Sequence, residues 1–287
     1  MITIKEVNDS YNEGIRKDDT GHFIFDTDFD FSTDLIMLHK DSKGFVNEDG
    51  LTYYYAYEFN PKTTSSQQKE FRDALKHKLT DPEVFYGDEA TQFVMNGIHK
   101  MNDMKNLNDF EVVVSTANHY GDKTLTGLMC SLIWEELNDS TFVLNIQLIK
   151  KLCSEVTFDR NKAKEALRKT NRYGSDEIAI ENALDKIEYD FNKEKKSGNL
   201  FTMKKYQPVA GRAGFMDFLK FANQYDQKLY EALKKGTEVL ICDDFITSGT
   251  TVKEIIRFLN SINPNNNISV FVLINQLRKY WHIKRKK

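Results

Sequence analysis

The 287-residue sequence is poor in cysteine, proline and tryptophan, and it contains no long apolar run. Its three cysteines, Cys130, Cys153 and Cys242, are too widely spaced for a C-x-x-C pair or a Cys/His zinc pattern. This spacing argues against a zinc site and a disulfide framework, and it is typical of a protein in a reducing cytoplasm. No stretch approaches the roughly 20 apolar residues that span a membrane, and no apolar signal segment follows the start. We therefore expect a cytoplasmic protein with no membrane contact.

Several kinds of binding site are also missing from the sequence. No G-x-x-x-x-G-K-[ST] or G-x-G-x-x-G motif occurs, which argues against a P-loop and against a dinucleotide site. The formal net charge of −3 gives no global basic field, so nucleic acid is not indicated as a partner.

One segment near the C-terminus carries most of the chemical information. Val239–Cys242 is a run of four apolar residues, which predicts a buried parallel strand. Asp243 and Asp244 follow, and then a hydroxyl-rich turn around Gly249. Apolar residues recur at helical spacing over Val252–Leu259, so the turn opens a helix.

This strand–turn–helix order predicts a phosphate site. It gathers backbone N–H groups and the positive end of a helix dipole around one point, where a phosphate monoester fits. The two carboxylates beside that point are acceptors for sugar hydroxyls. The chemistry indicated is recognition of a phosphorylated ribose.

The segment Val239–Thr251 resembles the phosphoribosyl-pyrophosphate (PRPP) binding motif of the type I phosphoribosyltransferases. That motif is a hydrophobic strand, two acidic residues, two apolar residues and a Thr/Ser-Thr/Ser-Gly-x-Thr/Ser loop, and all of these parts are present here. Phe245 departs from the pattern, because it is bulkier than the aliphatic residue or serine usual there.

The resemblance implies roles for individual residues. Asp243 and Asp244 would be the catalytic carboxylates, which accept hydrogen bonds from the ribose hydroxyls directly or through the water of a Mg²⁺ ion bound with PRPP. The 5′-phosphate would be bound by Thr247, Ser248, Gly249, Thr250 and Thr251. The pyrophosphate loop would be Thr116, Ala117, Asn118, His119, Tyr120 and Gly121, with Lys123 in the next helix. An ordinary turn between strand and helix is the alternative interpretation of that loop. The cations of a closing loop would be Lys204, Lys205 and Arg212, and the alternative for each of these is a solvated surface charge.

The organisation of the chain predicts an α/β fold with a doubly wound, mostly parallel sheet. From Phe110 onward strands and helices alternate, which implies parallel pairing. Residues 110–287 are therefore expected to form a phosphoribosyltransferase-like core, with a helical hood insertion at about 151–230. Residues 1–109 are expected to form an N-terminal accessory α+β region. It would contain a small antiparallel unit of strands near 23–25, 35–38 and 52–57, followed by helices over 67–79 and 89–104.

These features lead to two hypotheses of function. The first is a Mg²⁺-dependent phosphoribosyltransferase that transfers the 5-phosphoribosyl group from PRPP to a nucleobase-like nitrogen acceptor and releases pyrophosphate. The alternative is a non-catalytic module that senses PRPP or a nucleotide and acts with a partner, in phage conflict or modified-base metabolism. A homodimer and a protein partner bound through the N-terminal region are further expectations. The acceptor itself is not determined by the sequence.

Overall fold

The computed structural model describes residues 11–26, 29–30, 34–39, 45–46, 52–60, 62–77, 89–115, 125–136, 144–221, 227–246 and 249–275.

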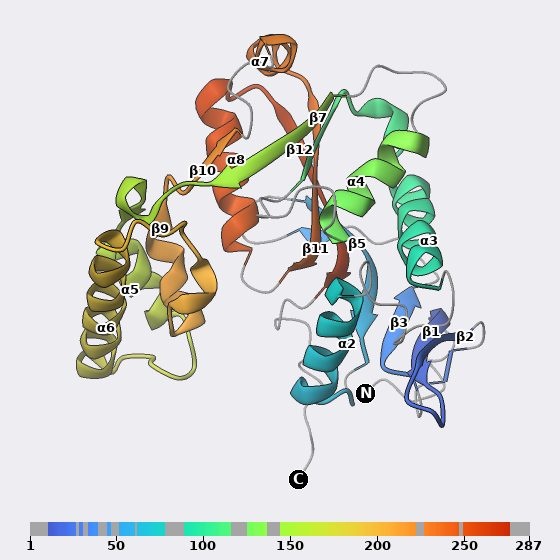
Figure 1. Ribbon diagram of the computed structural model, residues 1–287, viewed down its shortest axis with the longest axis horizontal. Coiled ribbons are helices and arrows are strands. Elements are labelled where there is room, and N and C mark those ends of the chain that lie inside the picture. Colours follow the sequence, from blue (N-terminus) through green and yellow to red (C-terminus); the bar gives the residue numbers. More distant parts are fainter. Residues whose placement is uncertain are drawn as a thin grey trace.

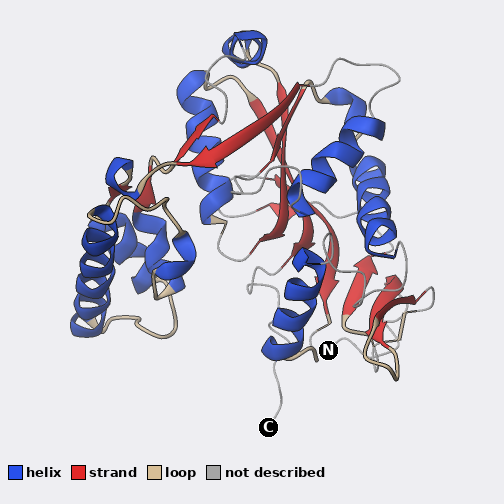
Figure 2. Ribbon diagram, in the orientation of Figure 1, coloured by secondary structure: helices blue, strands red, loops and turns tan. Residues whose placement is uncertain are grey.

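The centre of the fold is a sheet whose middle strands run parallel (Figure 2). In sheet order these strands are β7 (Leu144–Lys150), β6 (Val112–Ser115), β11 (Glu238–Ile246), β12 (Asn267–Asn275) and β5 (Thr52–Phe59). The predicted apolar run Val239–Cys242 lies in β11 and is fully buried, as a parallel strand covered on both faces should be.

Antiparallel strands extend the sheet on both sides. At one edge β10 (Leu219–Phe221) pairs with β7. Beyond β5 the sheet continues through β3 (Ile36–His39), β1 (Tyr11–Lys17) and β2 (Phe23–Asp26), and the short strand β4 (Phe45–Val46) pairs with β5.

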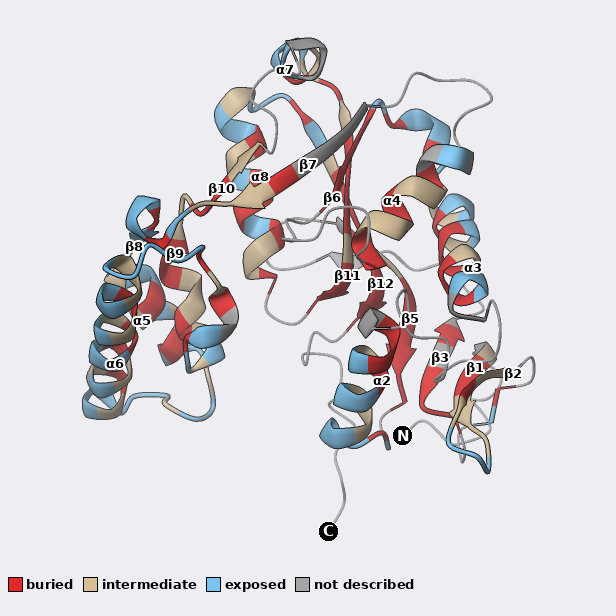
Figure 3. Ribbon diagram, viewed as in Figure 1, coloured by how far each residue is buried: buried red, intermediate tan, exposed pale blue. Residues whose placement is uncertain are grey.

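Helices cover both faces of the sheet. On one face α2 (Ser65–His77), α3 (Glu89–Met104) and α4 (Leu125–Glu136) share an apolar cluster that includes Leu240 and Cys242. On the other face α7 (Gln227–Lys235) and α8 (Thr250–Ile262) share a cluster that includes Val239 and Ile241. Figure 1 shows this arrangement, and Figure 3 shows β11 and β12 as buried strands between the two helical layers. The predicted doubly wound α/β class is confirmed.

An insertion between β7 and β10 forms a lobe that stands to one side of the sheet (Figure 1). It contains η3 (Cys153–Glu155), β8 (Thr157–Phe158), α5 (Arg160–Arg168), α6 (Glu177–Lys195), η4 (Met203–Lys205), η5 (Val209–Gly214) and β9 (Phe215–Met216). Because β7 runs parallel to β6 and β11, the lobe leaves the sheet at its carboxyl edge. The lobe is smaller than the predicted insertion of residues 151–230, since β10 and α7 pack with the sheet. Its use as a hood stays a prediction.

Charged contacts join the two helices of the lobe. Arg160 of α5 forms ion pairs with Glu181, Asp185 and Glu188 of α6. Glu177, at the start of α6, accepts a hydrogen bond from Arg168 (2.8 Å) and pairs with Lys164. These cations lower the pKa of Glu177 to about 2, Arg168 contributing most.

The N-terminal strands belong to the same sheet as the core. Strands β2, β3 and β5 lie where the sequence predicted strands, and β3 pairs antiparallel with β5 as expected. However, β5 also pairs in parallel with β12. One hydrogen-bonded sheet therefore contains strands from both sides of the predicted boundary between residues 109 and 110. The division into domains 1–109 and 110–287 stays a prediction. Among the described helices, none combines the length and apolar character needed to cross a lipid bilayer.

Candidate functional site

The two adjacent carboxylates lie inside the last part of β11. The sequence predicted that the strand would end at Cys242, but the ladder with β12 continues to the pair Ile246 and Asn275. Asp243 is opposite Val272 in this ladder and is half-buried, and Asp244 is buried. The carboxylates are therefore held by a strand, which fixes their positions more firmly than a loop would.

Each carboxylate is oriented by the backbone that follows it. Asp243 Oδ1 accepts a hydrogen bond from the N–H of Asp244 (3.0 Å), and Asp244 Oδ1 accepts one from the N–H of Phe245 (2.8 Å). Such local bonds replace ladder bonds and restrict the side-chain rotamers. Phe245, the residue that departs from the family pattern, is only 8% exposed and packs in the cluster below α2, α3 and α4. Its bulk is thus accommodated by the core.

Below the carboxylates, two thiols meet inside the core. Cys242 of β11 and Cys130 of α4 are both buried in the apolar cluster under α2, α3 and α4. Interaction with the Cys130 thiol, burial and the charge of Asp243 raise the pKa of Cys242 well above its ordinary value. The Cys242 thiol therefore stays protonated at neutral pH. Because the two residues are far apart in the sequence, no local pattern predicted this contact.

The loop after β11 turns at Gly249. Its backbone has φ 68° and ψ 4°, the left-handed conformation that glycine adopts without strain. Gly249 is the N-cap of α8, and its carbonyl accepts the N–H of Lys253 at 2.8 Å. Thr250 and Thr251 form the first turn of α8 and are partly exposed, whereas Thr247 and Ser248 lie outside the described residues. The turn therefore presents a helix N-terminus shortly after β11 in the chain, the arrangement that suits an anion.

The predicted pyrophosphate loop, Thr116–Gly121 with Lys123, lies outside the described residues. The strand before it, β6, ends at Ser115, which is opposite Cys242 in the parallel ladder. Strand β6 thus ends opposite the residue before Asp243. In the first turn of α4, Thr126 is 1% exposed, and among the described residues its Oγ1 has no hydrogen-bond partner. The sequence pattern did not single out Thr126.

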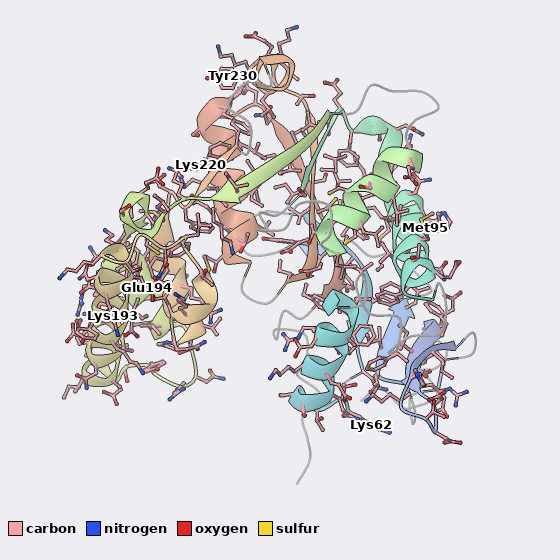
Figure 4. The ribbon with its side chains drawn as sticks, in the orientation of Figure 1. Lys62, Met95, Lys193, Glu194, Lys220 and Tyr230 are labelled. Carbon is pink, nitrogen blue, oxygen red and sulfur yellow. The ribbon has the colours of Figure 1, made fainter. Side chains whose placement is uncertain are left out.

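The predicted closing-loop cations lie in the lobe. Lys205 forms an ion pair with Glu194 of α6 at 2.7 Å, and Glu194 is marked with its neighbour Lys193 in Figure 4. Arg212 donates its Nε–H to the carbonyl of Tyr206 at 2.8 Å, and burial lowers the pKa of Arg212. The side chain of Lys204, in η4, lies outside the described part. The contacts of Lys205 and Arg212 named here are internal to the lobe.

One ion-pair group links the base of the lobe to the helix that starts at Gly249. Arg257 of α8 pairs with Asp217, which lies between β9 and β10, and with Glu254 of its own helix. The lobe and α8 are therefore joined through Asp217 and Arg257. Beside this pair, Phe258 of α8 makes an edge-to-face contact with Phe221 of the edge strand β10, with ring centroids 5.0 Å apart.

The residues at this site fit a magnesium ion that arrives with its ligand. Within the described part of the chain, no group of three or more His, Cys, Asp or Glu side chains is placed to hold a metal. A pair of carboxylates such as Asp243 and Asp244 is nevertheless a suitable donor set for Mg²⁺, which keeps several waters and takes its other ligands from phosphates.

Comparison with known proteins agrees with this geometry. Residues 190–286 match the family model described as phosphoribosyl transferase domain, a range that runs from the end of α6 through β11, Gly249, α8 and β12. No curated protein matches the chain. Residues 190–286 thus resemble a phosphoribosyl transferase domain, and this match supports the resemblance of Val239–Thr251 to the type I phosphoribosyltransferases.

Proposed function

We propose that this protein transfers the 5-phosphoribosyl group of PRPP to a nitrogen atom of a nucleobase-like acceptor and releases pyrophosphate. The observation that carries the proposal is the sequence of groups along β11 and α8. Two oriented carboxylates in the strand are followed by a left-handed glycine and a helix N-terminus, within the residues that resemble a phosphoribosyl transferase domain.

The reaction would break the bond between the anomeric carbon and the pyrophosphate oxygen and form a bond from that carbon to the acceptor nitrogen. Positive charge develops on the ribose ring as the leaving group departs. Asp243 and Asp244 would hold the ribose through its 2′- and 3′-hydroxyls and stabilise that charge. The N–H groups and hydroxyls of Thr247–Thr251 would hold the 5′-phosphate. A bound Mg²⁺ would supply charge neutralisation for the pyrophosphate.

The remaining parts of the site are proposals as well. Residues 116–121 with Lys123 would bind pyrophosphate, since β6, the strand before them, ends opposite Cys242. Thr126 would add a hydroxyl at the start of α4. Lys204, Lys205 and Arg212 would act from the lobe only after giving up contacts such as the ion pair between Lys205 and Glu194.

A cytoplasmic location, supported by the free cysteines, and a homodimer belong to the same proposal.

The test is pyrophosphate release from PRPP and Mg²⁺ with a panel of nucleobases. Asp243→Asn and Asp244→Asn should each lower kcat/KM by about 10²- to 10³-fold, as expected when a group that stabilises transition-state charge is removed. Asp103→Asn is the matched control, because Asp103 is an exposed carboxylate on α3. A wild-type protein that fails to bind PRPP in calorimetry would refute the proposal.

A second candidate is a module that binds PRPP or a nucleotide and signals to a partner without turnover. It is favoured by the engagement of Lys205 and Arg212 inside the lobe, since a catalytic closing loop needs its cations for the leaving group. Tight PRPP binding without pyrophosphate release, together with a stably associated protein, would favour sensing over transfer.

A further inference from the structure

The strand β5 brings side chains of the N-terminal region to the sheet face that carries α8. In the parallel ladders Ile241 is opposite Val270, and Val270 is opposite Tyr53. All three residues lie in the apolar cluster on the α8 face. Tyr53 therefore shares a face with the start of the phosphate loop, although it is distant in the sequence.

The ring of Tyr53 is buried among residues that flank the loop. Tyr53 is 2% exposed and shares its cluster with Ile246, the last residue of β11, and with Val252, in the first turn of α8. The loop from 247 to 251 is enclosed between these two residues in the sequence. Tyr53 thus belongs to the same buried cluster as the residues at both ends of the loop.

The hydroxyl of Tyr53 lies at the turn itself. A Cβ placed on Gly249 would be 3.7 Å from Tyr53 Oη and 3.7 Å from Ile246 Cδ1. Of the described side chains within 4 Å of that point, Tyr53 supplies the polar atom. Gly249 itself has no side chain with which to cap α8, so the turn depends on its surroundings.

We propose that Tyr53 is a positioning residue for the phosphate loop, and that its phenol hydroxyl keeps the left-handed turn at Gly249 in the conformation that binds the 5′-phosphate. This rests on the proposed function, because that function makes a 5′-phosphate the ligand of the loop. A phenol can both donate and accept a hydrogen bond, and its hydrogen bonds are stronger where water is excluded. The N-terminal region would then be a part of the phosphoribosyl site.

The experiment compares Tyr53→Phe with Tyr54→Phe. Both variants lose one hydroxyl from β5, but Tyr54 packs in the cluster on the opposite face of the sheet. Binding of ribose 5-phosphate, and of PRPP with Mg²⁺, is measured by calorimetry. We expect Tyr53→Phe to weaken binding of both ligands by about 3- to 10-fold, the size of one net hydrogen bond, and Tyr54→Phe to bind as wild type does.

Amide hydrogen exchange gives a readout that does not depend on ligand. Tyr53→Phe should speed exchange at the amides of Gly249, Thr250 and Thr251, while the amides of Leu240 and Ile241 in β11 stay protected. Faster exchange over all of β11 would show a general loss of stability and would overturn the proposal.

The outcomes separate the two proposals. If wild type and Tyr53→Phe bind ribose 5-phosphate with equal affinity, the role of Tyr53 is overturned and the proposed function stands. Equal losses in the Tyr53 and Tyr54 variants also overturn it. Wild-type protein that binds neither ligand overturns the proposed function, and the role of Tyr53 with it.

Discussion

Replacement of Gly249 by alanine tests how much the turn of the phosphate loop contributes to ligand affinity and to stability. The backbone at Gly249 is left-handed, and a residue with a Cβ pays about 1–2 kcal/mol for that conformation. The added methyl group meets its nearest neighbours, Ile246 Cδ1 and Tyr53 Oη, at 3.7 Å, which is ordinary van der Waals contact. The whole cost of the substitution is therefore conformational.

This cost appears in one of two measurable quantities. If the variant keeps the strained turn, its free energy of unfolding falls by about 1–2 kcal/mol. If the turn relaxes, the strain is restored when ligand binds, and affinity falls by about 5- to 30-fold. Because α8 has no side-chain cap at Gly249, we expect the turn to relax and the affinity for ribose 5-phosphate to fall.

Gly236→Ala is the matched control. Gly236 also has a positive φ, 81°, and its nearest neighbours, Asn265 Cβ and the Asn265 carbonyl oxygen, lie 3.4 Å from the Cβ position. It precedes β11, at the opposite end from Asp243. Urea unfolding should show that Gly236→Ala loses stability, and calorimetry should show that it binds ribose 5-phosphate as wild type does. The reasoning is refuted if Gly249→Ala changes neither quantity, or if both variants lose affinity equally.

Two further predictions concern titratable groups. Burial raises the pKa of Cys153, and interaction with the Cys130 thiol together with burial raises that of Cys242, so the native protein should react slowly with an aromatic disulfide reagent at pH 8 and expose all three thiols when denatured; rapid reaction of the native form would contradict this. The pKa of Glu177 is lowered from 4.5 to about 2, so the stability it contributes is complete above about pH 4.5 and is lost as the pH falls toward 2. The difference in Tm between wild type and Glu177→Gln should therefore shrink as the pH falls from 6 to about 2.5, and a difference that is constant over this range would refute the assignment.

The local pattern of the sequence was sufficient for most elements of the core. The apolar run before Asp243 predicted β11, because a strand buried on both faces is apolar at every position. The helical spacing from Val252 predicted α8, because a helix buried on one side repeats its apolar residues every three or four positions. The same patterns located α2 and α3. They did not show where β11 ends, because residues 243–246 belong to the strand through their pairing with β12.

The sequence by itself determined the chemistry of one segment. Two carboxylates, a glycine and hydroxyl residues stand next to one another in the chain, so their proximity needs no tertiary fold. Only the tertiary structure decided what surrounds that segment. The aromatic run near residues 52–57 predicted a packing strand, but its place beside β12, with the Tyr53 hydroxyl at Gly249, depends on pairing between distant strands. The contacts of Cys130 with Cys242 and of Arg257 with Asp217 arise in the same way. Such pairings are set by how the whole sheet buries its two faces, and the pattern of any single strand is compatible with several neighbours.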